Sequence, residues 1–105
     1  MKAYLILDVR VTDLTSFMDY VEQIPDHLRR HGGTYLVEGV RPEVIEGDWK
    51  PETLVVLKFP SEHNSRAFLA DPLVETVFSI RHNSSVGNLV FVSGSSWRDA
   101  LEREN

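Results

Sequence analysis

Arg81 and His82 are neighbouring side chains that can bind and act on a small molecule. A guanidinium can hold a carboxylate through two parallel hydrogen bonds, and an imidazole can exchange protons near neutral pH. Arg81 falls at the end of a predicted helix, next to His82, and an arginine there can instead interact with the negative end of the helix dipole. Arg81 is therefore a candidate ligand-binding residue and His82 a candidate catalytic residue, with a structural helix end as the alternative.

Asp8 and Glu46 are candidate proton acceptors of a second type. Asp8 falls on the mixed face of a predicted strand, and Glu46 falls at the mouth of a turn. A partly buried carboxylate can have a raised pKa and act as a general base. Alternatively, both carboxylates form ion pairs across the sheet or across a dimer, for which the sequence offers Arg10, Arg41 and Arg81.

Tyr20 and Trp49 are aromatic residues that can line a ligand pocket between a sheet and its helices. Aromatic side chains are equally common as packing residues and interface anchors. For Trp49, which lies in a turn between Gly47 and Pro51, the alternative is a turn anchor or a dimer contact. The candidate ligand-binding set is thus Tyr20, Trp49 and Arg81.

His27 and His31 are four residues apart on a predicted helix, with Asp26 nearby, and could present two imidazoles to a metal ion. A metal site needs a third ligand, and the neighbouring Arg29 and Arg30 make this helix end positive. The favoured interpretation is that these cationic side chains stabilise the negative end of the helix dipole. We therefore expect no metal site.

Other cofactor and nucleophile chemistry has no support in the sequence. The chain has no cysteine, so it has no thiolate nucleophile, thiolate metal site or disulfide. Ser61 is best explained as a helix cap, because it lacks the glycine-flanked setting of a hydrolase nucleophile. No glycine pattern is suited to a phosphate group. We expect no cofactor.

The composition also limits the partners. A formal net charge of −5 disfavours nucleic acid, because phosphate binding requires a basic surface. The apolar run at the start of the chain is too short for a signal peptide, and no run approaches the length of a membrane span. We therefore expect a soluble, cytoplasmic protein.

The first half of the chain predicts a strand, a helix and two further strands. Residues 2–11 alternate, with Ala3, Leu5, Leu7, Val9 and Val11 on one face. A helix capped by Thr12 or Asp13 follows and ends at Gly32-Gly33, and Pro25 predicts a kink or restart near Ile24. Its apolar stripe is Leu14, Phe17, Met18, Val21, Ile24 and Leu28. The next predicted strands are residues 34–40, extended or accompanied by 44–46, and residues 53–59, which are apolar on both faces.

The second half predicts a helix and a last strand. The helix begins after Ser61, is interrupted at Asp71-Pro72, a favoured cap and first-turn pair, and continues to about Arg81. Residues 82–88 are polar and predict a loop, and residues 89–93 predict a strand. We expect one domain over residues 1–93 and a tail over 94–105, in which Trp97 and Leu101 are spaced for a short helix.

The order β-α-β-β-α-β predicts an α+β, ferredoxin-like fold, with a four-stranded antiparallel sheet and both helices on one face. The other face is then expected to be apolar. Its predicted residues are Tyr4, Ile6, Leu36, either Leu54 and Val56 or Val55 and Leu57, and Phe91 or its neighbours. An apolar face of this size needs a cover, and a second copy is the simplest one. We predict a homodimer.

Several segments of the chain resemble a known family. They are residues 1–6, Val11-Thr12-Asp13, Tyr20-Val21, Gly32-Gly33 with Tyr35-Leu36-Val37, residues 46–52, and Val55-Val56 with Phe59-Pro60-Ser61. The family is catalogued as domain of unknown function 1330 and belongs to the dimeric α/β-barrel superfamily. The resemblance covers about residues 1–93 and implies a dimer in which two sheets face one another. It implies no established reaction, and residues 82–87 depart from the arginine- and alanine-rich run of the family.

Relatives in the wider superfamily include cofactor-free monooxygenases, lactone isomerases, haem-degrading enzymes and chlorite dismutase-like proteins. Fold alone does not choose among these activities, and no motif here matches their catalytic residues. Three functions therefore stay open. The first is a small homodimeric protein that binds a small organic molecule between sheet and helices. The second is a cofactor-free monooxygenase- or isomerase-like enzyme using Asp8 or His82, and the third is a structural interaction module without a ligand.

Overall fold

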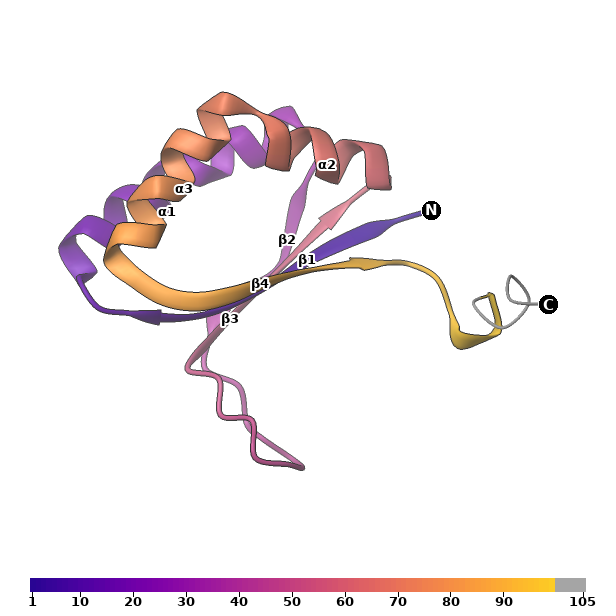
Figure 1. The fold of residues 1–105 in the computed structure, drawn as a ribbon, viewed down its shortest axis with the longest axis horizontal. Helices are drawn as coiled ribbons and strands as arrows, with labels where there is room; N and C mark the ends of the chain where they lie inside the picture. The colour runs from indigo at the N-terminus through magenta and orange to yellow at the C-terminus, as the bar shows by residue number, and fades with distance from the viewer. Residues whose placement is uncertain (100–105) are drawn as a thin grey trace.

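Four antiparallel strands form one sheet in the spatial order β2-β3-β1-β4, and helices α1, α2 and α3 lie on one of its faces (Figure 1). The computed structural model describes residues 1–99. Its elements are β1 (Ala3–Val11), α1 (Leu14–Arg30), β2 (Thr34–Val40), β3 (Thr53–Phe59), α2 (Glu62–Ala70), α3 (Pro72–Ser84) and β4 (Ser85–Ser93). This is the predicted ferredoxin-like arrangement, and its second helical segment is divided into α2 and α3.

The central strand β1 separates the two faces of the sheet. Ala3, Leu5, Leu7 and Val9 are buried under the helices, as the alternation predicted. Leu5 pairs with Leu57 and Phe91 on the neighbouring strands, so these residues also face the helices. Phe91 therefore faces the helices, and its neighbours Val90 and Val92, the other alternative in the prediction, lie on the open face. Of the two alternatives for β3, Leu54 and Val56 face away from the helices.

Helix α1 has the predicted ends. Asp13 caps its start by accepting hydrogen bonds from the Ser16 amide and hydroxyl. At its end the amide of Gly33 donates to the Leu28 carbonyl and the amide of Gly32 to the Arg29 carbonyl, a Schellman motif that places Gly32 at φ 76°. The helix is continuous through Pro25, so the predicted restart near Ile24 is wrong.

The buried face of α1 differs from the predicted stripe. The helix turns Phe17, Tyr20, Ile24 and Leu28 towards the sheet at spacings of three and four residues. Three residues of the predicted stripe are exposed instead, namely Leu14, Met18 and Val21. The difference arises because Tyr20, a large aromatic residue, belongs to the core and shifts the buried face towards its own side of the helix.

The predicted caps of the second helical segment are confirmed, but its end is not. Ser61 caps α2, and Asp71 caps α3 with Pro72 in the first turn. However, α3 continues to Ser84 and β4 starts at Ser85, so the predicted loop over residues 82–88 is wrong. The Ser84 carbonyl accepts hydrogen bonds from the Thr12 and Asp13 amides, which fixes this helix end beside β1. The polar residues that follow are tolerated in β4 because it is an edge strand.

The connection between β2 and β3 projects from the sheet on the side away from the helices (Figure 1). Residues 44–46 form no strand, contrary to the prediction. Two irregularities in the pairing of β2 with β3 precede the connection, and Gly39 adopts φ 102° at the second. Pro42 then offers no amide to continue the ladder. The projecting loop carries Ile45, which is 84% exposed.

The face of the sheet opposite the helices is open and mainly apolar. Its side chains, which are half-buried or exposed, include Tyr4, Ile6, Val37, Val40, Leu54, Val56, Val86, Val90 and Val92. No helix within residues 1–99 is long and apolar enough to cross a membrane. Residues 97–99 are helical, and Leu101, the second residue of the predicted tail pair, lies outside the described residues.

Candidate functional site

A cavity of about 430 Å³ lies between the sheet and α3. Its polar lining comes from Arg81 and His82 of α3 and from Ser85 and Asn88 of β4. The apolar lining is Leu7, Val9, Leu69, Phe78 and Leu89. Both predicted chemical residues therefore lie in the wall of one cavity, here called the acid cavity, and both belong to α3, which continues past them to Ser84.

Arg81 is buried, at 5% exposed, in the wall of the acid cavity. Its guanidinium carbon lies 4.4 Å from the ring centroid of Phe78 and 5.6 Å from that of Tyr20. Within residues 1–99 no carboxylate approaches Arg81 closely enough to form an ion pair. Aromatic faces compensate a buried cation only in part. A guanidinium in this setting favours an anion brought by a ligand.

His82 lies at the exposed end of the acid cavity. Its Nε2 atom is 3.2 Å from Nη2 of Arg81. A guanidinium can only donate, so Nε2 accepts this hydrogen bond and the neutral ring carries its proton on Nδ1. The contact orients the imidazole directly beside the guanidinium.

A second cavity of about 250 Å³ lies between the sheet and α1. Tyr20, Tyr35 and Glu38 contribute its polar groups. Burial raises the pKa of Tyr20, and the nearby Arg81 guanidinium opposes this effect only in part. Burial is also the main reason that the pKa of Tyr35 rises to about 12, with smaller contributions from Tyr20 and Glu38. Both phenols are protonated at neutral pH, as ordinary phenols are, and can donate hydrogen bonds.

Trp49 and Asp8 meet on the opposite side of the sheet. The indole Nε1 of Trp49 donates to Oδ2 of Asp8 over 3.0 Å. Trp49 lines a shallow hollow of the projecting loop together with Ile45 and Glu46. Trp49 therefore does not line a cavity between sheet and helices with Tyr20, which corrects that prediction, and neither Asp8 nor Glu46 reaches the acid cavity.

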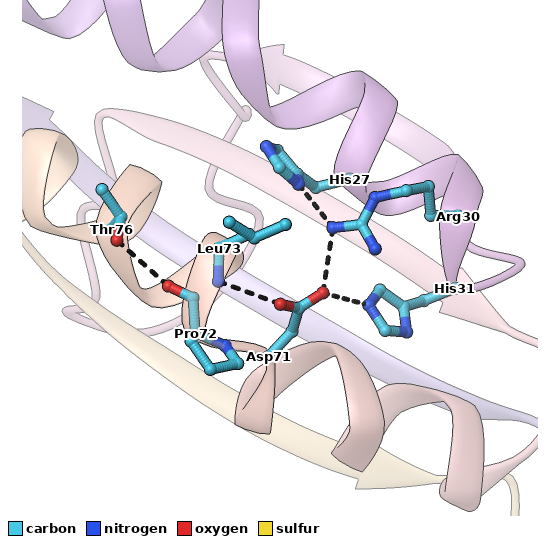
Figure 2. A network of polar contacts seen from close by, with 7 residues as sticks. All are labelled: His27, Arg30, His31, Asp71, Pro72, Leu73 and Thr76. Carbon is cyan, nitrogen blue, oxygen red and sulfur yellow. Dashed lines mark hydrogen bonds and ion pairs between the residues drawn. The ribbon is translucent and has the colours of Figure 1, made fainter.

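His27 and His31 take part in a network that joins two helices (Figure 2). Nε2 of His31 and Nη2 of Arg30 both donate to Oδ2 of Asp71, and Arg30 also contacts Nδ1 of His27 at 2.7 Å. Among residues 1–99 no group of three or more histidine, aspartate or glutamate side chains is arranged to hold a metal ion. The network connects the end of α1 to the start of α3.

Sequence reasoning missed Tyr35 and Phe78 as cavity residues. Tyr35 pairs with Leu57, whose side chain faces the helices, so its position follows from strand register. The alternation within residues 34–40 could have indicated that every second side chain faces the helices. It could not have shown whether Tyr35 or Leu36 is one of them, because a bulge follows Tyr35 and interrupts the alternation. Phe78 precedes Arg81 by three residues, the helical spacing that places both on one face.

Comparison with known proteins gives a family and a fold. The family model for Domain of unknown function (DUF1330) matches residues 2–95. A search among functionally curated proteins finds no match. Among solved structures, RPA0582, a protein of unknown function from Rhodopseudomonas palustris, has a TM-score of 0.71 and 14% identity over 90% of this chain and 83% of its own.

Two further structures show the same fold. SnoaB, a cofactor-independent oxygenase from Streptomyces nogalater, has a TM-score of 0.64 and 11% identity, covering 90% of this chain and 94% of its own. A dimeric ferredoxin-like protein of unknown function from Jannaschia sp. CCS1 has a TM-score of 0.61 and 8% identity, covering 89% and 99%. At these identities the likeness establishes the fold alone. Because the family model spans nearly all of the described sheet and helices, the chain belongs to the DUF1330 family.

Proposed function

We propose that this protein binds a small organic acid in the acid cavity, with Arg81 as the carboxylate clamp. The observation that carries the proposal is the buried guanidinium, which has no carboxylate partner within residues 1–99 and lines a cavity of about 430 Å³. Charge-assisted hydrogen bonds to a carboxylate are stronger in such a poorly solvated setting than in water. The apolar walls suit a ligand with a hydrocarbon or aromatic body.

The protein is also proposed to act as a homodimer in which a second copy covers the open face. The centre of this face is apolar, with Ile6 paired to Val56 and Val90. One end is positive, because Lys2 lies close enough to Lys58 to lower the pKa of that ammonium group. The other end carries Asp8. A two-fold axis crossing the strands near Ile6 would bring Lys58 opposite Asp8 of the partner subunit.

Acid binding is tested by titrating the protein with benzoate, phenylacetate and hexanoate, using calorimetry and thermal shift. Benzamide, a neutral analogue of benzoate, is the ligand control. We expect the acids, but not benzamide, to bind and to raise the melting temperature, because binding to the native state stabilises it.

Two substitutions test whether Arg81 binds the carboxylate of the ligand. Arg81→Ala is expected to weaken acid binding by about tenfold or more, and Arg81→Lys by less, because lysine keeps the charge but not the paired donors. Arg66→Ala, which removes an exposed arginine of α2, is the matched control and should bind normally. Acid binding that survives unchanged in both Arg81 variants would contradict the clamp.

A second candidate function is cofactor-free oxygenase or isomerase chemistry with His82 as the proton acceptor. The favouring observation is the contact between His82 and Arg81, which would place the imidazole beside a carboxylate-bearing substrate. Asp8, the other predicted proton acceptor, lies on the opposite side of the sheet. Turnover of a substrate found by screening should fall strongly in His82→Gln and be retained in Asp8→Asn; turnover insensitive to His82→Gln excludes this role.

A further inference from the structure

The acid cavity and the second cavity share a floor. Leu7 and Val9, on the helix-facing side of β1, line both of them. One cavity extends from this floor towards α3 and β4, and the other extends towards α1 and β2. The two spaces are therefore neighbours across the inner face of one sheet rather than unrelated surface hollows.

Three side chains separate the two cavities, and we call them the partition: Tyr20, Phe78 and Arg81. The ring centroids of Tyr20 and Phe78 lie 6.4 Å apart, and the Arg81 guanidinium makes a cation–π interaction with each ring. A small hollow of about 10 Å³, lined by all three and by Leu7, lies between the cavities. Such a volume holds about one water molecule. The partition is thus incompletely packed and consists of side chains alone.

We propose that the two cavities are compartments of one binding site for an elongated monocarboxylic acid. Its carboxylate binds Arg81, its apolar body lies on Leu7 and Val9, and its far end carries a neutral hydrogen-bond acceptor that reaches Tyr35. The rings of Tyr20 and Phe78 move aside when the ligand enters, and Arg81 holds its carboxylate. This inference rests on the proposed acid-binding function and adds the class of acid that the site prefers.

The charges of the second compartment favour a ligand whose far end is neutral. Tyr20 and Tyr35 are protonated there at neutral pH, as ordinary phenols are, and burial raises the pKa of each further. They offer hydrogen-bond donors to a hydroxyl or carbonyl oxygen. Glu38 lines the same compartment and contributes a negative charge. A second carboxylate at the far end of the ligand would therefore be repelled by Glu38, whereas the first carboxylate is bound by Arg81 at the other end.

The test uses four aromatic acids, namely one short monoacid, two longer monoacids and one diacid. They are benzoate, biphenyl-4-carboxylate, 4′-hydroxybiphenyl-4-carboxylate and biphenyl-4,4′-dicarboxylate, each titrated by calorimetry against the full chain. The hydroxylated monoacid is expected to bind at least tenfold more tightly than benzoate, and more tightly than the dicarboxylate. Glu38→Gln should improve dicarboxylate binding and leave benzoate unaffected.

Two variants examine the second compartment directly. Tyr35→Phe removes one hydroxyl and should weaken binding of the hydroxylated probe by about fivefold to tenfold, with no effect on benzoate. Val55→Phe should fill the compartment and reduce the affinity for this probe to that for benzoate. Tyr4→Phe, which removes a hydroxyl on the opposite face of the sheet, is the matched control.

The outcomes separate the two proposals. If benzoate binds through Arg81 but the longer monoacids bind no more tightly, or Tyr35→Phe and Val55→Phe leave their affinity unchanged, the two-compartment site is wrong while the acid clamp stands. If no acid binds, both are wrong. A melting transition like that of the unsubstituted chain confirms that each variant is folded.

Discussion

Nε2 of His31 donates a hydrogen bond to Oδ2 of Asp71 over 2.8 Å and connects the end of α1 to the start of α3. Arg30 donates to the same oxygen, and the Leu73 amide donates to Oδ1 (Figure 2). The hydrogen bond from His31 is the main reason that the pKa of Asp71 lies well below its usual range, with contributions from Leu73 and Arg30. One carboxylate thus caps α3 and holds α1 against it, which keeps the two helices that line the cavities in place.

Replacing Asp71 by asparagine tests the role of this charge. Asparagine is an equally good helix cap, so Asp71→Asn removes the charged contacts while keeping the cap. Because the folded-state pKa of Asp71 is below its unfolded value, its stabilisation is present above about pH 4 and is lost as the pH falls further. We expect the variant to melt several degrees lower at pH 7, with the difference shrinking below pH 4, in thermal melts at pH 3–7.

The control for this prediction is Asp26→Asn, which removes the carboxylate of an exposed pair with Arg29. Exposed pairs contribute little to stability, so its melting temperature should stay close to that of the unsubstituted chain. A difference between Asp71→Asn and the unsubstituted chain that is the same at pH 3 and pH 7 would show that the charge is not responsible.

Local signals predicted the elements, and they did not predict contacts between distant residues. The alternation of residues 3–9 and the Asp71-Pro72 cap were sufficient for the strand and the helix start, because both depend on short-range geometry. The polar residues 82–88 were misassigned because an edge strand tolerates the composition of a loop. The position of Tyr35 and the contact of Trp49 with Asp8 depend on strand register and loop path, which no local pattern encodes.

Gly87 controls the approach of β4 to β1 at the floor of the acid cavity. A Cβ atom on Gly87 would lie 2.2 Å from the Asp8 carbonyl oxygen and 3.0 Å from Cα of Val9. These are backbone atoms, so Gly87→Ala must separate the strands. We expect a loss of about 2–4 kcal/mol in the free energy of unfolding, measured by urea titration. Asn88→Ala, at the exposed neighbouring position, should change it little; equal effects of the two would refute this explanation.

The hydrogen bond between Trp49 and Asp8 is expected to attach the projecting loop to the sheet. A double-mutant cycle with Trp49→Phe and Asp8→Ala isolates this contact, because phenylalanine retains the aromatic ring and loses only the donor. We expect a coupling of about 0.5–1.5 kcal/mol in the free energy of unfolding. Strictly additive effects of the two substitutions would mean that the loop is held by other contacts.

The tail is expected to dock on the partner subunit of the proposed dimer. Trp97 is 89% exposed within one chain, whereas a large aromatic residue usually finds a contact. Truncation after Ser93 should raise the dimer dissociation constant by about tenfold, as measured by analytical ultracentrifugation over a concentration series. If the truncated chain dimerises as tightly as the full chain, the tail has no part in the interface.

The open face can be tested by placing one charge at its centre. Val90 lies opposite Ile6 and is 51% exposed within one chain, so Val90→Lys should be tolerated by the monomer fold. In a face-to-face dimer the same lysine would be buried without a partner, which is strongly unfavourable. We expect light scattering at micromolar concentration to give twice 12.0 kDa for the unsubstituted chain and 12.0 kDa for Val90→Lys. Leu14→Lys, on the exposed side of α1, should retain the doubled mass. A monomeric mass for the unsubstituted chain would contradict the dimer itself, and a doubled mass for Val90→Lys would place the interface elsewhere.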